Sequence, residues 1–485
     1  MINPVRGLGR QGIILDTDAY DIPLEALSDG NNIRIVNGKI ARVTGAVTSD
    51  TGSFDATFSY GGTRVNVGSS WLKIDGTDVT PTSFTAASTY ATSQVGDFKI
   101  VVNPDDAPFV GNGGQFSTMT NWPSTLRAER VIPFQGFLIA TGLVDGGTDQ
   151  KYRVRFSDTV DPGTINPSWD YTVTTNLAGF NDLDQDVLDV KQLGGIVILY
   201  TRNKSIAMEF TGGTFVFGFR DVNDDDGIIC PGAVAEFNDQ HLVVGNDTIY
   251  VFNGNAKQSI ADGRVADSFY RELGNSQSVR CLKHEDRNEI WVLYSTDDSI
   301  EADRCLIYNY QYNAWTKQDL PAKVKSAVIG PRQNLQQYST WQGNADFWST
   351  IDPADFESTP FLVTSNRIYQ GDTSYGVDGV SITSFFEQRK LDLDQLFGEV
   401  QSNKRITRLN PQVSGSGQLV IKVAATDNAL GITNYQRSAT FNIETDHKVD
   451  VRAKGRYLAI RFEMTGLGFF ETTGYDLHVE KSDGR

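Results

Sequence analysis

The amino-acid sequence predicts an all-β protein, a β-propeller with an additional antiparallel β-sandwich-like platform domain. Three observations lead to this prediction. Short apolar strand pairs recur seven times, and most of them end in a glycine turn. The 485 residues include 46 glycines, 27 phenylalanines and 18 tyrosines, which suit tight turns and strands, but only 4 methionines. After about residue 380 the pattern changes to longer strands of alternating polarity.

Residues 1–50 are predicted to lie outside the repeat, as an N-terminal platform segment. Their clearest element is a β-hairpin formed by residues 33–36 and 39–43. Asn37-Gly38 stands between the two runs, and this dipeptide favours a type I′ turn, in which both central residues have positive φ.

Residues 51–380 are predicted to form the β-propeller, with six or seven blade-like units. In the clearest unit, residues 240–254, two apolar runs flank an Asn246-Asp247 turn. Four of the six intervals between successive units are about 40–50 residues, the length expected for one four-stranded blade. The two wider intervals require insertions, and one insertion is expected near residues 333–360. The related strand pairs begin near Phe58, Phe98, Phe137, Ile196, Ile290 and Phe361.

One helix is expected within the repeat, over residues 262–274. Val265, Phe269 and Leu273 recur at helical spacing, and Gly274 follows them as a stop signal.

Residues 381–485 are predicted to form a C-terminal antiparallel β domain. Alternate residues are apolar in the segments 418–423 and 457–464, so each strand is expected to bury one face. Residues 390–397 are expected to link this domain to the propeller.

The net charge of the chain, −17 at pH 7, argues against an ordinary nucleic-acid binder, because affinity for the phosphate backbone requires a basic surface. The same acidity suits either simple solubility or a passage through which DNA slides without adhering. The longest apolar stretch, residues 194–200, is too short to cross a bilayer, and the first residues lack the apolar core of a signal peptide. Cys230, Cys281 and Cys305 form no disulfide or metal-ligand pattern and are expected to be reduced and buried.

Two motifs are typical of ligand sites, and in both cases the surrounding sequence favours another interpretation. Residues 7–12 match the G-x-G-x-x-G dinucleotide fingerprint, which requires a preceding strand and a following helix. Only six residues precede it, too few for a strand, and a strand-like run follows, so no cofactor is expected. Residues 221–227 offer Asp221, Asn223 and Asp225 as weak metal candidates, but their spacing departs from that of an EF-hand loop. A solvated acidic turn is the favoured interpretation.

Catalytic groups are scarce in the sequence. The four histidines stand apart, and neither an H-x-x-H nor a G-x-S-x-G motif is present. No catalytic residue is assigned, and the chain is not expected to be an enzyme. Two carboxylates that act together can be distant in sequence, so a polysaccharide hydrolase stays open as an alternative.

Several blocks of the chain carry a resemblance to a known family. Residues 23–42, PLEALSDGNNIRIVNGKIAR, resemble the opening of structural proteins from short-tailed bacteriophages. Further blocks of the same resemblance are residues 203–219, 227–236, 245–254, 303–315, 454–457 and 474–478. In this order they resemble the tail nozzle family, also described as tail tubular protein B or packaged-DNA stabilisation protein.

The resemblance implies a structural virion protein with no catalytic role. Nozzle proteins contain a propeller and form a homo-hexameric ring below the portal/adaptor ring. There they extend the DNA channel, retain packaged DNA and dock tail fibres or spikes. The chain would be made in the host cytoplasm and reside in the virion tail. It would contact double-stranded DNA without sequence recognition and would need no membrane insertion.

The resemblance also implies where partners bind. The platform segments 1–50 and 381–485 are expected to meet the ring above. The chain is shorter than the larger nozzle proteins, so a separate fibre-docking insertion is expected to be reduced or absent, and residues 333–360 are where it would lie. Two alternatives stay open: a propeller-type glycan-binding or polysaccharide-hydrolysing protein, and another virion scaffold of the same fold. The interface candidates are Arg34, Lys39, Arg42, Trp341, Phe347, Trp348 and Arg456.

Overall fold

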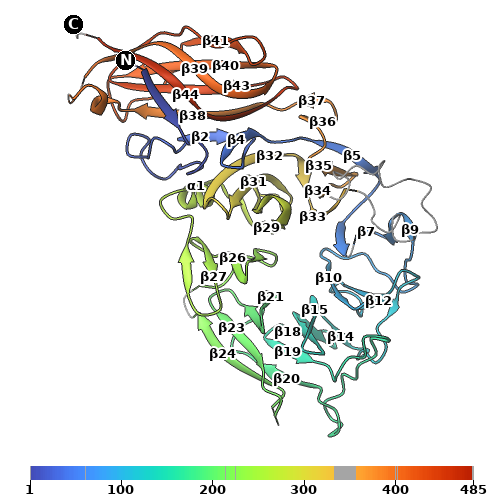
Figure 1. Ribbon diagram of the computed structural model, residues 1–485. Coiled ribbons are helices and arrows are strands. Elements are labelled where there is room, and N and C mark those ends of the chain that lie inside the picture. The colour runs from blue at the N-terminus through green and yellow to red at the C-terminus, as the bar shows by residue number, and fades with distance from the viewer. Residues whose placement is uncertain are drawn as a thin grey trace.

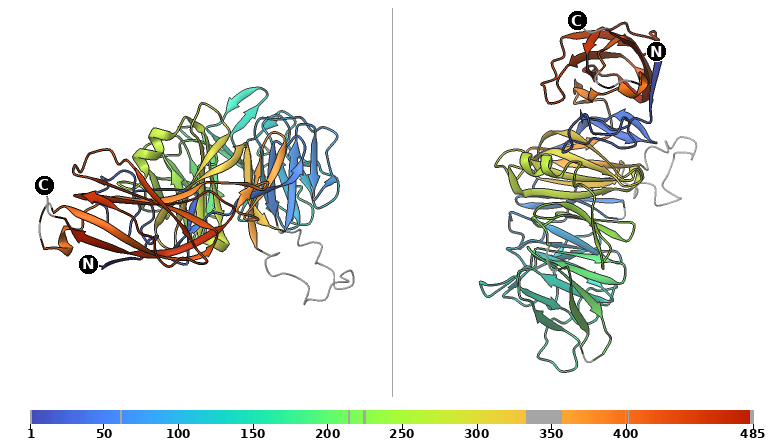
Figure 2. Two further views of the ribbon diagram at one scale, coloured as in Figure 1. Left: turned by 90° about the horizontal axis from the view of Figure 1, so that it is seen from above. Right: turned by 90° about the vertical axis from the view of Figure 1, so that its left-hand side faces the viewer.

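Antiparallel β-sheets make up most of the regular secondary structure in the described part of the chain, which confirms the predicted all-β class. The computed structural model describes residues 2–482 except 61, 214, 224, 225, 333–356, 399 and 401. The helices of this part of the chain are α1 (Ala266–Glu272) and two 3₁₀ turns, η1 (Glu285–Arg287) and η5 (Asp394–Leu396). Both chain ends lie in a two-sheet unit at one end of the molecule, and the other sheets extend away from it (Figure 1, Figure 2).

Six four-stranded sheets follow one another along the described part of the chain. The first sheet consists of β6 (Ala56–Tyr60), β7 (Thr63–Gly68), β8 (Trp71–Ile74) and β9 (Thr77–Asp78). The second consists of β10 (Ala91–Val95), β11 (Phe98–Val102), β12 (Phe109–Gly111) and β13 (Ser117–Thr118). The third consists of β15 (Arg130–Phe134), β16 (Phe137–Thr141), β19 (Arg153–Phe156) and β20 (Gly179–Asp182). The fourth sheet consists of β21 (Asp189–Leu193), β22 (Ile196–Tyr200), β23 (Ser205–Phe210) and β24 (Phe217–Asn223). The fifth consists of β25 (Val234–Phe237), β26 (Gln240–Val244), β27 (Ile249–Phe252) and β28 (Lys257–Ser259). The sixth consists of β29 (Asn275–His284), β30 (Glu289–Ser295), β31 (Ala302–Asn309) and β32 (Ala314–Val324).

A seventh sheet combines strands from both ends of the repeat. β33 (Ser326–Pro331), β34 (Ser358–Val363) and β35 (Arg367–Gly371) are joined by β5 (Ala46–Thr51), which pairs antiparallel with β35. The short strands β36 (Gly376–Val377) and β37 (Val380–Ser381) extend this sheet beyond β5. The predicted boundary at residue 50 therefore moves, because β5 belongs to the last sheet of the repeat.

The seven strand pairs recognised in the sequence fall into seven different sheets. Six of them begin in the second strand of a sheet, and the pair near Phe58 begins in the first. The wide interval between the third and fourth pairs holds a small extra sheet, which is the insertion that the spacing required. Two of its strands, β17 (Leu143–Asp145) and β18 (Thr148–Gln150), lie in this interval, and the third, β14 (Leu126–Arg127), lies just before the third pair.

Each sheet packs against the next through apolar side chains. Val65 of the first sheet and Val101 of the second share one buried cluster, and Ile100 of the second and Leu138 of the third share another. β33 of the seventh sheet also lies beside β6 of the first. Figure 1 shows the seven sheets following one another around a common centre.

His241 is a buried hydrogen-bonding group between the fourth and fifth sheets. Its Nε2 donates to the carbonyl oxygen of Gln192 at 2.9 Å, and its Nδ1 accepts from the hydroxyl of Tyr200 at 2.7 Å. Both ring nitrogens are therefore satisfied in the neutral imidazole. Burial lowers the pKa of His241 to about 4, because the charged ring would lose its hydration inside the core.

This burial predicts a pH dependence of stability. An unfolded histidine, with a pKa of about 6.5, takes up a proton on acidification, whereas folded His241 stays neutral down to its lowered pKa. Stability therefore falls as the pH drops between these two values. From about pH 7 to about pH 5 the wild type should lose about 2 kcal/mol more than His241→Gln. Urea unfolding of both proteins at both pH values measures this difference, and equal pH slopes would contradict it.

The two-sheet unit is built from both ends of the chain. One sheet has the order β3 (Ile33–Val36), β4 (Lys39–Arg42), β44 (Phe469–Lys481), β39 (Lys404–Ser416) and β42 (Ala453–Gly455), with β1 (Ile2–Arg6) also paired to β44. The other has the order β2 (Asp29–Asn31), β38 (Ser384–Leu391), β43 (Tyr457–Met464), β40 (Gln418–Thr426) and β41 (Arg437–Asn442). The predicted platform segments thus form one unit.

Aromatic side chains hold the two sheets face to face. Phe386 stacks on Phe462 with ring centroids 4.7 Å apart, and it contacts Phe470 of the opposite sheet at 5.9 Å. The predicted strands around 418–423 and 457–464 are confirmed, and their alternate apolar residues face this core.

The two local turn predictions are also confirmed. Asn37 and Gly38 have φ of 50° and 72°, as the predicted type I′ turn requires. The helix α1 forms within the predicted residues 262–274, although it is shorter than predicted, and it buries Phe269.

The glycine motif of residues 7–12 brings the backbone of the two-sheet unit against the sixth sheet. The strand β1 does precede it, contrary to the prediction, but the chain continues in extended form. Ile13 donates its backbone N–H to the carbonyl of Trp315 at 2.8 Å. A Cβ on Gly12 would lie 2.4 Å from that same oxygen. Gly12 is therefore explained by close backbone approach, not by a nucleotide.

Candidate functional site

A cluster of buried charged side chains lies where the two-sheet unit meets the sixth and seventh sheets. Arg34 of β3 donates from Nη1 to Asp372 at 2.9 Å and from Nη2 to Glu289 at 3.2 Å. These three side chains are 2%, 3% and 1% exposed, respectively. His284 Nε2 lies 3.3 Å from Oδ2 of Asp372, and Trp291 Nε1 donates to Glu289 at 3.0 Å. The cluster connects three sheets.

The ionisation of this cluster is stabilised from within. Burial alone would raise the pKa of Asp372, but the charge of Arg34 and the hydrogen bond to His284 hold it well below its usual value. Asp372 and Glu289 raise the pKa of Arg34 against the effect of its own burial. Because all of these groups are enclosed, the cluster acts as a structural joint and not as an accessible site.

The interface candidates of the N-terminal hairpin separate into buried and exposed groups. Arg34 and Arg42 are 2% and 3% exposed, so neither guanidinium is presented to a partner. Arg42 donates to the side chain of Ser384 at 3.1 Å and to the carbonyl of Gly466 at 2.6 Å. The interface prediction for these two arginines is corrected, since both are used inside the chain. The physical reason is that a buried guanidinium must be paired, and the paired oxygens lie in distant segments.

The other interface candidates have different positions. Lys39 is exposed and forms an ion pair with Glu471 at 3.2 Å. Arg456 is half-buried, with its guanidinium 4.8 Å from the ring centre of Tyr457. Trp341, Phe347 and Trp348, with the predicted insertion that carries them, lie outside the described residues.

Asp221 and Asn223, two of the weak metal candidates, already contact other groups of the protein. Lys204 Nζ lies 3.2 Å from Asp221 and 2.7 Å from Asp184, so an ammonium group already supplies the cation. Asn223 donates its side-chain amide to the carbonyl of Asp226 at 2.9 Å, and Asp225 lies outside the described residues. Across residues that the structure describes, no cluster of three or more His, Cys, Asp or Glu is arranged to hold a metal ion.

The three cysteines are free thiols, as predicted. Cys230 and Cys305 are buried, and Cys281 is partly buried. Burial raises the pKa of Cys230 to about 11, so this thiol stays protonated and unreactive at neutral pH.

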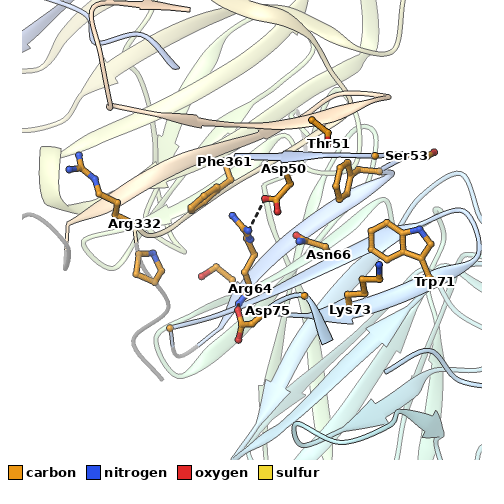
Figure 3. Close-up of a pocket in the computed structure, with 16 residues that line it drawn as sticks. Asp50, Thr51, Ser53, Arg64, Asn66, Trp71, Lys73, Asp75, Arg332 and Phe361 are labelled. Atoms are coloured by element: carbon orange, nitrogen blue, oxygen red, sulfur yellow. Dashed lines mark hydrogen bonds and ion pairs between the residues drawn. The ribbon is translucent and has the colours of Figure 1, made fainter. Parts of the chain in front are cut away.

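A pocket of about 630 Å³ lies between the first and seventh sheets. Figure 3 shows Trp71 and Lys73 on one side of it, Phe361 on the other, and Arg64 between them. Its size is within the range of small-molecule sites, about 300–1,000 Å³. None of its residues was predicted from the sequence to belong to a functional site. The detectable signal was the alternation in β8, where Trp71 and Lys73 face outward and the residues between and after them are buried.

The aromatic wall of the pocket is set by local geometry. Trp71 is half-buried and meets Phe54 edge to face, with ring centroids 5.5 Å apart. A Cβ on Gly68 would lie 2.3 Å from the indole ring, so glycine at this position allows the ring to lie over the strand end. The ammonium of Lys73 lies 4.7 Å from the centre of the same ring.

The polar groups of the pocket are arranged around Arg64. Its Nη2 lies 2.8 Å from Asp50, its guanidinium lies 4.7 Å from the ring centre of Phe361, and its backbone N–H donates to Asp75 at 2.9 Å. Asp50 and Asp75 are the carboxylates that line the pocket, and Arg64 contacts both of them.

Comparisons with known proteins identify no family. No protein-family model matches the chain, and no curated protein matches it. Among solved structures, the crystal structure of the computationally designed Ika8 protein is similar, with 9% sequence identity and a TM-score of 0.37. That match covers 67% of this chain and 99% of the designed one. In the described part of the chain, no helix has the length and apolar character needed to span a membrane.

Proposed function

We propose that this chain is a structural virion protein that forms the nozzle of a short phage tail, built on a seven-bladed β-propeller. The observation that carries the proposal is the pairing of β5 with β35, which places a strand from before the first sheet in the last one. Such an exchange ties the first and last blades of a propeller together. The contact between β33 and β6 supports the same closure.

The two-sheet unit supports a scaffold role. It contains both chain ends, and the buried Arg34 cluster connects it to the sixth and seventh sheets. A platform held in this way would keep a constant position relative to the propeller when copies assemble. We assign it to the contact with the portal/adaptor ring, with Lys39 and Arg456 as candidates at its surface.

The charge of the chain fits a channel for DNA. Each copy carries −17, so a homo-hexamer would surround its axis with acidic protein that duplex DNA passes without adhering. A closed ring also requires two different patches of each subunit to meet. This role needs no sequence recognition.

Exposed aromatic side chains support docking of a tail fibre or spike. Phe215, Phe210, Tyr171 and Phe180 are 80%, 46%, 45% and 40% exposed. Phe180 lies in β20 and Phe210 in β23, and Phe215 and Tyr171 lie in the connections that lead to β24 and β20. β20 and β24 lie at the end of the molecule opposite the two-sheet unit (Figure 1). Exposed aromatic side chains often mark protein contacts.

The proposed ring predicts a hexamer with an axial hole. Native mass spectrometry over a range of protein concentrations, with negative-stain images, should show six copies around an opening wide enough for duplex DNA. The same measurement in the presence of the portal/adaptor complex covers assembly on a template. A chain that stays monomeric under both conditions would contradict the nozzle proposal.

A further inference from the structure

We propose that the pocket between the first and seventh sheets binds an oligosaccharide, a function separate from channel formation. The proposal does not rest on the nozzle assignment. It rests on a cavity of about 630 Å³, an aromatic wall, and polar groups whose hydrogen-bonding capacity is only partly used by the protein.

The aromatic wall suits the apolar face of a sugar ring. Trp71 is half-buried, and its edge contact with Phe54 and the lack of a side chain at Gly68 hold the indole in place. A large aromatic ring that is fixed before binding loses little conformational entropy when a ligand stacks on it. The C–H groups on one face of a pyranose can stack on such a ring once the flexible side chain of Lys73, whose ammonium lies 4.7 Å from the ring centre, moves aside to meet the sugar hydroxyls.

The polar groups offer both donors and acceptors. Asn66 accepts from the hydroxyl of Thr57 at 2.7 Å, and its side-chain NH₂ donates to no group among the described residues. Lys73 has no carboxylate within ion-pair distance in the same part of the chain. One oxygen of Asp75 accepts the backbone N–H of Arg64, and its second oxygen has no described donor. Hydroxyl groups donate and accept, so they match this mixed set.

The charge balance narrows the ligand class. Asp50 neutralises Arg64, and Asp75 carries one negative charge against one positive charge on Lys73. Arg332, which also lines the pocket, donates to the backbone carbonyl of Asp372 at 3.0 Å. A pocket with this small positive excess fits a neutral or singly acidic sugar better than a nucleic acid or a polyphosphate.

The test is a printed array of purified microbial polysaccharides, followed by calorimetric titration with soluble oligosaccharides of those retained. Wild-type protein should bind at least one neutral or uronic-acid-containing polysaccharide. Trp71→Ala should weaken binding about tenfold or more. Lys73→Met and Ser53→Trp should also weaken binding of the oligosaccharide. Both change exposed or half-exposed positions of the pocket wall, so they test the proposal even if Trp71→Ala does not fold.

The matched control is Phe180→Ala. Phe180 is likewise an exposed aromatic with a cation over its ring, Arg153 at 4.2 Å, but it lies in the third sheet. This variant should bind as the wild type does. Retention of no polysaccharide by the wild type would overturn the proposal, and so would unchanged binding in Lys73→Met and Ser53→Trp. Neither result depends on whether the chain forms a hexamer.

Discussion

Arg34→Met is expected to destabilise the protein by about 3–5 kcal/mol. The substitution removes the one described cation that contacts both Asp372 and Glu289. Glu289 would stay buried with no ion-pair partner among the described residues, and Asp372 would keep Arg287 at 3.1 Å and His284 at 3.3 Å. Methionine fills a similar volume, so the loss reflects charge more than packing. The midpoint of urea unfolding measures the effect, and hydrogen exchange across β3 and β30 locates it.

A matched control lies in the same hairpin. Lys39→Met breaks an ion pair whose two side chains are 41% and 36% exposed, and such pairs contribute about 0–1 kcal/mol. The double variant Arg34→Met with Glu289→Gln should recover part of the loss, because Glu289 has no other ion-pair partner among the described residues, whereas Asp372 keeps Arg287 at 3.1 Å. An Arg34→Met protein no less stable than Lys39→Met would contradict the assignment of this cluster as the joint.

The lowered pKa of Asp372 sets the pH range over which the joint stabilises the fold. A carboxyl group whose folded pKa is depressed contributes stability above its unfolded pKa, and the contribution is lost as the pH falls through the folded value. The joint should therefore be fully formed at neutral pH and should persist below pH 4, about the usual carboxyl pKa.

Removal of residues 1–45 is expected to prevent folding of the C-terminal sheets. These residues include β1, β3 and β4 of one sheet and β2 of the other. Burying an aliphatic side chain contributes about 1.5–3 kcal/mol, and the sum exceeds the total stability of a typical domain, about 5–15 kcal/mol. The truncated chain should be insoluble or sensitive to protease. The aliphatic side chains lost from the core include Val5, Leu8, Ile13, Leu27, Ile33 and Ile40.

The control for the truncation is complementation. Co-expression of residues 1–45 as a separate fragment should restore soluble protein, because the missing strands can pair in trans. A truncated chain that is soluble without the fragment and still docks to the portal/adaptor complex would contradict both the structural role and the proposed position of this segment. Truncation alone cannot separate docking from folding, since the segment is part of the core.

The sequence by itself determined the elements whose signals are local. The alternation of apolar residues located the C-terminal strands, the Asn37-Gly38 dipeptide located a hairpin, and the recurring strand pairs located the seven sheets. Burial of every second residue and the φ preferences of turn residues act over a few positions, so they can be read from the chain directly.

Only the tertiary structure decided how distant segments combine. β5 pairs with β35, β1 pairs with β44, and Arg34 meets Asp372, in each case across most of the chain. The pocket likewise joins Trp71 to Phe361. The residues around a strand edge or a charged side chain do not indicate which partner it has, because many strand edges could pair with that strand and many carboxylates could pair with that charge. The partner is selected by packing of the whole chain, which brings one of them within reach and excludes the others.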